Sequence, residues 1–270
     1  MDKLYMPYKS QNVTAIIPAF NEAKSIAGVV TGLFALIEDD QPVVDRVIVC
    51  DNASTDGTGN LARRAGATVC SEFRQGYGFA CLRALETLER QNESDIVVFV
   101  DGDLSVKPEE LTGLLDGILV GNDLVVGTRV SRLQEQHALG FHQRVGNHLA
   151  SGLVRWLWGV NVSDLGPFRA IKYKSLRLLA MEDRRFGWTV EMQVKAIQAN
   201  MRYLEIPVST KRRVGKSKIS GTIRGTFGAF FGIFGKVAQL YLCEAKFQVR
   251  VRRARILLND PLQKPHNPPL

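Results

Sequence analysis

The first half of the chain alternates short apolar segments with helical patterns, and this alternation constrains the fold more than any other feature. Five segments rich in β-branched residues have the pattern of strands: 13–17, 47–50, 67–70, 95–100 and 123–126. Between them, four segments have helical patterns: 22–37, 58–65, 76–88 and 108–119. We expect Pro18 to end the first strand. This order of elements predicts an α/β fold with a mostly parallel sheet flanked by helices.

Polar residues follow these predicted strands. They form five clusters, at 18–22, 51–56, 76–78, 101–103 and 127–129. In an open parallel sheet, ligands bind outside the carboxyl ends of the strands, where the connecting loops gather. Each cluster by itself also fits a helix cap, a tight turn or a solvated charge. Five clusters at equivalent ends of the strands predict one shared site.

The cluster after strand 95–100 contains two carboxylates, Asp101 and Asp103, separated by Gly102. A buried strand that ends on two acidic residues directs carboxylate oxygens out of one edge of the sheet. Such oxygens are the ligands of hard divalent cations, which commonly serve phosphates. A plain solvated turn is the alternative for this triplet.

Taken in order, these motifs resemble a known enzyme family. Pro-Ala-Phe-Asn-Glu, Asp-Asn-Ala-Ser-Thr-Asp-Gly-Thr, Gly-Tyr-Gly-Phe-Ala, Asp-Gly-Asp and Gly-Thr-Arg look like family 2 of the nucleotide-sugar-dependent glycosyltransferases. The dolichyl-phosphate mannose synthase and polyprenyl-phosphate glycosyltransferase group is most similar, and segments 163–171 and 213–218 fit it too. The resemblance covers residues 13–221. It implies a Rossmann-like fold of the GT-A type and an inverting, metal-dependent transfer of a hexose.

The resemblance also assigns roles to residues. The donor, a UDP- or GDP-sugar, is expected to contact Pro18, Ala19, Phe20, Glu22, Asp51, Asn52, Ser54, Gly76, Asp101, Gly102 and Asp103. Asp101 and Asp103 match the pair that holds Mg²⁺ or Mn²⁺ against the diphosphate. Asp51 matches a carboxylate that accepts a base N–H, which both uracil and guanine offer. Asn52 and Ser105 depart from the group's usual acidic residue and Gln, and neither change removes a metal ligand.

The acceptor determines which other residues act. An alcohol needs a general base, and Glu191 lies in the region where the family supplies one. A polyprenyl phosphate, with a second pKa of about 6, is already ionised and needs cations instead. The expected catalytic residues are Asp103, Arg129, Asp164, Arg169, Glu191, Arg213 and Lys218, with Lys216 as a further cation. Asp164 either pairs with an arginine or touches the sugar.

Residues 211–270 differ from the catalytic domain expected over 1–210. Segment 211–260 carries a net charge of +10, whereas the whole chain carries +8. Segment 219–241 predicts a helix with a broad apolar side, and 247–258 alternates apolar and basic residues. We expect this tail to lie on an anionic membrane surface, to pack on the catalytic domain or to join a homo-oligomer.

Other features set the compartment. Neither a signal peptide nor a run of about 18 apolar residues is present, and the four cysteines lack zinc or disulfide spacing. We expect a cytoplasmic protein, peripheral on the cytoplasmic face of a membrane.

Three other functions remain open. A glycosyltransferase with a soluble or glycan hydroxyl acceptor would share every nucleotide motif and would use Glu191 as its base. A nucleic-acid-binding module fits the charge but leaves the acidic cluster unexplained, so nucleic acid is not an expected partner. A dehydrogenase is the weakest alternative, because the Gly-Tyr-Gly at 76–78 lacks the third glycine of a dinucleotide fingerprint.

Overall fold

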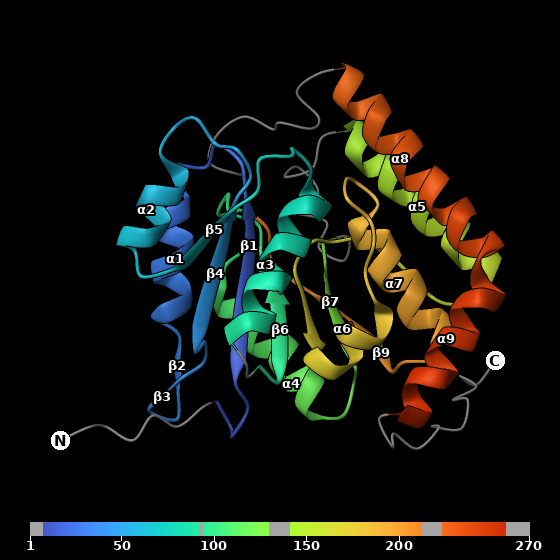
Figure 1. The fold of residues 1–270 in the computed structure, drawn as a ribbon, viewed down its shortest axis with the longest axis horizontal. Coiled ribbons are helices and arrows are strands. Elements are labelled where there is room, and N and C mark those ends of the chain that lie inside the picture. The colour runs from blue at the N-terminus through green and yellow to red at the C-terminus, as the bar shows by residue number, and fades with distance from the viewer. Residues whose placement is uncertain (1–7, 92–93, 130–140, 212–222, 258–270) are drawn as a thin grey trace.

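A computed structural model of the chain describes residues 8–91, 94–129, 141–211 and 223–257. Its centre is a seven-stranded sheet with the order β5-β4-β1-β6-β8-β7-β9 (Figure 1). The strands are β1 (Val13–Ala19), β4 (Arg46–Asp51), β5 (Thr68–Ser71), β6 (Ile96–Phe99), β7 (Leu124–Thr128), β8 (Arg169–Lys172) and β9 (Tyr203–Pro207). Within this sheet, β8 alone runs antiparallel to its neighbours. The expected mostly parallel sheet is confirmed.

Helices cover both faces of the sheet. They are α1 (Ile26–Phe34), α2 (Thr58–Arg64), α3 (Tyr77–Gln91), α4 (Leu111–Leu119), α5 (Phe141–Trp158), α6 (Tyr173–Leu179), α7 (Trp188–Gln198), α8 (Ile223–Leu242) and α9 (Glu244–Leu257). Because side chains alternate along a strand, Ala15 and Ile17 of β1 pack with α1 and α4, while Ile16 packs with α3, α6 and α7. Outside α7, α5 and α8 lie side by side (Figure 1).

The structure moves three predicted boundaries. β1 continues through Pro18 to Ala19, whose carbonyl accepts a hydrogen bond from the backbone N–H of Asn52. The first helix begins at Ile26 instead of residue 22, because the Glu22 carbonyl first accepts the N–H groups of Ser25 and Ile26 in a turn. The helix ends at Phe34, and Ile37 belongs to a short hairpin of β2 (Ile37–Glu38) and β3 (Gln41–Pro42).

The tail folds as two helices that pack on the rest of the chain. Val237 and Leu240 of α8 are buried against α5 and α7. The segment 247–258, in which apolar and basic residues alternate, belongs to the helix α9 as far as Leu257. This helix buries Phe247 and Val251 against the core on the side of the sheet covered by α3, α6 and α7. Arg250 bonds Glu182 at 3.0 Å and the carbonyl oxygen of Leu179 at 3.1 Å. In the described part of the chain, no helix is long and apolar enough to cross a membrane.

Candidate active site

The carboxyl ends of β4, β1 and β6 lie next to one another at one edge of the sheet. Ala19 and Asp51 are partners in the register of β1 and β4, and the N–H of Val100 bonds the carbonyl of Ile16 at 3.0 Å. Each following loop contains a non-glycine residue with positive φ: Asn21 (53°), Ala53 (61°) and Leu104 (58°). Left-handed backbone of this kind is costly and concentrates at functional sites. The edge predicted from the sequence therefore exists and holds strained loops.

The loops after β1 and β4 are bonded to each other. Ser54 Oγ accepts the N–H of Asn21 at 2.9 Å, and Thr58 Oγ1 accepts the N–H of Glu22 at 2.8 Å. The Ser54 N–H in turn donates to Asp51 Oδ1 at 3.0 Å. These bonds hold Asp51 and Ser54 next to the loop of Pro18, Phe20 and Glu22, which are half-buried.

Asn52 holds a neighbouring loop in place. Both hydrogens of its buried amide go to carbonyls, of Glu72 at 3.0 Å and Arg74 at 2.8 Å, and its oxygen accepts the N–H of Gly76 at 2.8 Å. At Gly76 a side chain would overlap the carbonyl oxygen of Arg184. Asn52 and Gly76 thus fix the position of the backbone between residues 72 and 76. Both amide hydrogens of Asn52 are used in these contacts, so neither is left for a nucleotide.

Asp101 and Asp103 follow β6 at the same edge. Asp103 is 2% exposed and its Oδ1 accepts the N–H of Ser105 at 2.9 Å. Asp101 is half-buried and accepts a hydrogen bond from the Tyr77 hydroxyl at 3.3 Å. Burial, followed by the charge of Asp101, raises the pKa of Tyr77 well above its ordinary value, so this hydroxyl stays a donor. Sequence reasoning missed Tyr77, although it stands inside the Gly-Tyr-Gly motif.

This carboxylate pair has the donor chemistry of a Mg²⁺ or Mn²⁺ site. Mg²⁺ is commonly bound by one or two carboxylates, with waters and substrate phosphates completing its octahedron. Among the described residues, no group of three or more His, Cys, Asp and Glu side chains could hold a metal by itself. Two hard oxygen ligands without a third suit a cation that a diphosphate helps to bind.

Arg129 and Asp164 form a close ion pair beside the carboxylates. The backbone N–H, Nε and Nη2 of Arg129 donate to Asp164 at 2.8, 2.9 and 2.8 Å. Burial would raise the pKa of Asp164, but Arg129 keeps it below the ordinary value. Burial would lower the pKa of Arg129, yet Asp164, with Asp101 and Asp103, raises it. Of the two roles considered for Asp164, pairing with an arginine is the one observed.

Arg169 is placed differently from the sequence expectation. We expected the Gly-Pro-Phe turn before it to present its guanidinium to a ligand, but Arg169 is fully buried at the start of β8. It donates to the carbonyls of Thr189, at 3.0 Å, and Gly166. Burial lowers its pKa. Its guanidinium thus holds the segment before β8 to α7, while its backbone pairs with Phe99 at the carboxyl end of β6.

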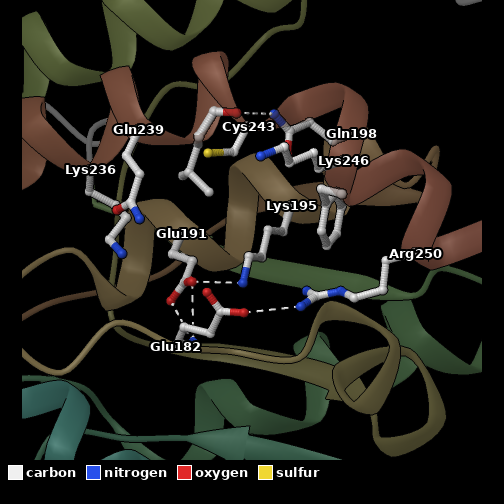
Figure 2. A pocket seen from close by; sticks show the side chains of 11 residues that line it. Glu182, Glu191, Lys195, Gln198, Lys236, Gln239, Cys243, Lys246 and Arg250 are labelled. Carbon is white, nitrogen blue, oxygen red and sulfur yellow. Dashed lines mark hydrogen bonds and ion pairs between the residues drawn. The ribbon is translucent and has the colours of Figure 1, made fainter.

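Glu191, the candidate general base, lines a cavity of about 220 Å³ between α7, α8 and α9 (Figure 2). It is 1% exposed, pairs with Lys195 at 2.7 Å and accepts the N–H groups of Glu182 and Asp183. Asp101 and Asp103 do not line that cavity. The carboxylate is therefore committed to structural contacts, which disfavours its use as a base.

The remaining residues are Trp188, at the start of α7, and the three basic residues expected at 213–218. Trp188 is core, 1% exposed, with its ring 5.8 Å from that of Phe99. Arg213, Lys216 and Lys218 lie outside the described residues. The chain enters that segment near the carboxylates, because the N–H of Lys211 bonds the carbonyl of Ser105 at 2.7 Å.

Comparisons with known proteins agree with this geometry. The profile of glycosyl transferase family 2 matches residues 14–179, more than half of the chain. The chain belongs to glycosyl transferase family 2. An uncharacterised glycosyltransferase of Mycobacterium tuberculosis is 34% identical over 79% of this chain and 92% of its own length. The undecaprenyl-phosphate mannosyltransferase of Micrococcus luteus is 31% identical over 79% of this chain and 89% of its own. This family 2 protein is thus a glycosyltransferase, as the sequence motifs indicated.

The chain is also similar to a second relative named for a polyprenol-linked product and to a solved structure. The polyprenol monophosphomannose synthase of Mycolicibacterium smegmatis is 28% identical over 79% of this chain and 83% of its own. Glucosyl-3-phosphoglycerate synthase of Mycobacterium tuberculosis, solved with Mn²⁺, UDP and phosphoglyceric acid, superposes with a TM-score of 0.68 over 86% of this chain and 79% of that one. At 21% identity, this last likeness establishes the GT-A fold alone.

Proposed function

We propose that this glycosyltransferase moves a hexose from a UDP- or GDP-sugar to a polyprenyl phosphate, with inversion at the anomeric carbon and with Mg²⁺ or Mn²⁺. The observation that carries the proposal is the pair Asp101 and Asp103 at the carboxyl end of β6, with Arg129 beside it. Relatives named for undecaprenyl-phosphate mannosyl transfer and polyprenol monophosphomannose synthesis support the acceptor class.

On the donor side, the residues divide the work. Asp51 and Ser54, with Phe20, border the place of the nucleoside, and Asp101 and Asp103 would hold the cation. A bound cation neutralises the negative charge that grows on the departing nucleoside diphosphate. Arg129 is kept protonated by Asp164 and adds a second positive charge beside the two carboxylates. The C1–O bond to the diphosphate breaks, and its electron pair leaves with that group.

On the acceptor side, the phosphate oxygen forms the new bond to C1 and no proton has to be removed. The contacts of Glu191 support this choice, because its carboxylate is already bonded to Lys195 and two backbone N–H groups. A hydroxyl acceptor would need a base near the reacting carbon. The carboxylates named at the sheet edge already have other roles, Asp51 at the nucleotide, Asp101 and Asp103 at the cation and Asp164 in the pair with Arg129.

A membrane surface is the expected place of the acceptor. Three apolar residues of α5, Val145, Leu149 and Trp156, are exposed, and their spacings of four and seven place them on one side of the helix. Tyr241 and Leu242 at the end of the neighbouring α8 are exposed as well. Apolar side chains on one helix face, next to the basic α9, suit binding in a membrane interface.

A thermal-shift screen of UDP- and GDP-sugars with Mn²⁺ tests the donor half of the proposal. The right donor should raise the melting temperature by mass action, by an increment that needs the cation. The Asp103→Ala variant should fold and lose that increment, whereas Asp116→Ala, on an exposed side of α4, should keep it. A donor that stabilises Asp103→Ala as much as the wild type would contradict the metal assignment.

A further inference from the structure

An open groove of about 490 Å³ lies between the start of α3, the loop before α7 and the helix α8. Its walls combine two aromatic side chains with several charges. The lining includes Phe79, Asp183, Arg184, Arg185, Phe186 and Lys236. A cationic and aromatic groove of this kind is suited to a molecule that has both an anionic and an apolar part.

The groove adjoins the carboxylate pair through one turn of α3. The carbonyls of Arg185 and Arg184 accept the N–H groups of Gly78 and Phe79, at 3.2 and 3.0 Å. A side chain at Gly78 would overlap the carbonyl of Asp183, so glycine is needed for this close approach. The residue before Gly78 is Tyr77, whose hydroxyl bonds Asp101. The backbone that shapes the groove is therefore continuous with the backbone that positions a metal-site carboxylate.

Some charged side chains of the groove form ion pairs within the described part of the chain and others do not. Lys236 pairs with Asp183 at 3.3 Å, and Glu182 pairs with Arg250 at 3.0 Å. By contrast, the guanidinium groups of Arg184 and Arg185 form no ion pair with any residue that the structure describes, although Arg184 lies 5.8 Å from the ring of Phe79. Both arginines are exposed. Two adjacent guanidinium groups without a carboxylate partner provide the donors that a phosphate monoester accepts.

We propose that this groove binds the polyprenyl phosphate acceptor, with Arg184 and Arg185 on its phosphate and Phe79 and Phe186 against its first isoprene units. The proposal rests on the proposed function and adds the location of the acceptor. Charge complementarity selects the occupant, since the free positive charges stand next to aromatic rings. The far wall of the groove is α8, through Lys236 and a glycine, Gly232, whose added side chain would meet Phe186. A prenyl chain leaving the groove would follow α8 towards its exposed apolar end.

The test compares two charge-matched double variants with a water-soluble acceptor, geranyl phosphate, so that membrane binding does not contribute. R184Q/R185Q removes the two groove arginines. R63Q/R64Q removes two adjacent exposed arginines of α2, which do not line the groove. With the donor that the screen identifies, R184Q/R185Q should raise KM for geranyl phosphate by about tenfold or more, because two charge-assisted hydrogen bonds are lost. KM for the donor should stay unchanged, and R63Q/R64Q should behave like the wild type.

Two further readouts separate the outcomes. R184K/R185K keeps the charges but loses the planar guanidinium fork, and it should give an intermediate KM. An unchanged KM for geranyl phosphate in R184Q/R185Q, with transfer by the wild type intact, overturns the groove assignment alone. Absence of transfer to any prenyl phosphate by the wild type, with transfer to a hydroxyl acceptor instead, overturns the proposed function and the groove together. An equal rise of KM in both double variants shows a general charge effect and also overturns the groove.

Discussion

Breaking the pair between Arg129 and Asp164 should cost a measurable part of the stability of the fold. Asp164 has no exposed surface, whereas the side chain of Arg129 is 20% exposed. Removing one partner of a buried ion pair costs about 3–5 kcal/mol. In Asp164→Asn the amide oxygen still accepts one of three hydrogen bonds, and water reaches part of Arg129. We therefore expect a loss of about 2–3 kcal/mol, which lowers Tm by about 4–6 °C for a chain of this size.

A double-mutant cycle separates this pair from its surroundings. Asp164→Asn, Arg129→Gln and the double variant are unfolded by heat and by urea, and the interaction free energy is the departure from additivity. The three hydrogen bonds between the two residues predict a coupling of about 1.5–3 kcal/mol. Additive losses, or a loss below about 0.5 kcal/mol in Asp164→Asn, would refute the reasoning, since such a value is typical of a surface position.

Three more results follow from described contacts. Arg129 lowers the pKa of Asp164, so the stability that the pair contributes is present above pH about 4 and is lost as pH falls through the folded pKa. The difference in Tm between the wild type and Asp164→Asn should therefore stay constant from about pH 7 to 5 and become smaller only at lower pH. Gly78→Ala should lower the free energy of unfolding by about 1–3 kcal/mol, because the added methyl group would overlap the loop before α7. Gly146→Ala should not lower it, because a methyl group added there meets no neighbouring atom within 4 Å. Equal Tm values for the two variants would contradict this packing. Glu191→Gln should lower Tm because Lys195 loses its buried partner, yet keep kcat for a prenyl phosphate within about threefold; a collapse of kcat at unchanged Tm would assign Glu191 as a base.

The parallel half of the fold could be predicted from the sequence because its signals are local. Apolar runs such as 95–100 lie in buried strands, and the clusters after β1, β4 and β6 lie where the rule for parallel sheets places them. Boundaries were less accurate. Pro18 does not end β1, and the first helix starts later than its apolar periodicity suggests, because a turn at Glu22 comes first.

What the sequence could not provide depends on contacts between distant segments. The antiparallel β8 pairs with two strands far away in the chain, and no local pattern indicates that arrangement. For the same reason Arg169 appears free in the sequence although it is buried against Thr189. The tail helices have an amphipathic pattern that fits a membrane, a dimer or a packed layer equally well. Val237 of α8 and Phe247 of α9 are buried, so one side of each helix packs on the rest of the chain.

Transfer of labelled hexose tests the central claim most directly. UDP- and GDP-sugars carrying a radiolabel are incubated with the protein, geranylgeranyl phosphate and Mg²⁺ or Mn²⁺, and the organic phase is counted with and without EDTA. The account predicts organic-phase label from one donor, lost with EDTA and in Asp101→Ala, with the label released by mild acid as expected of a glycosyl phosphate. Label that stays in the aqueous phase with every donor, or transfer that persists in EDTA, would contradict it.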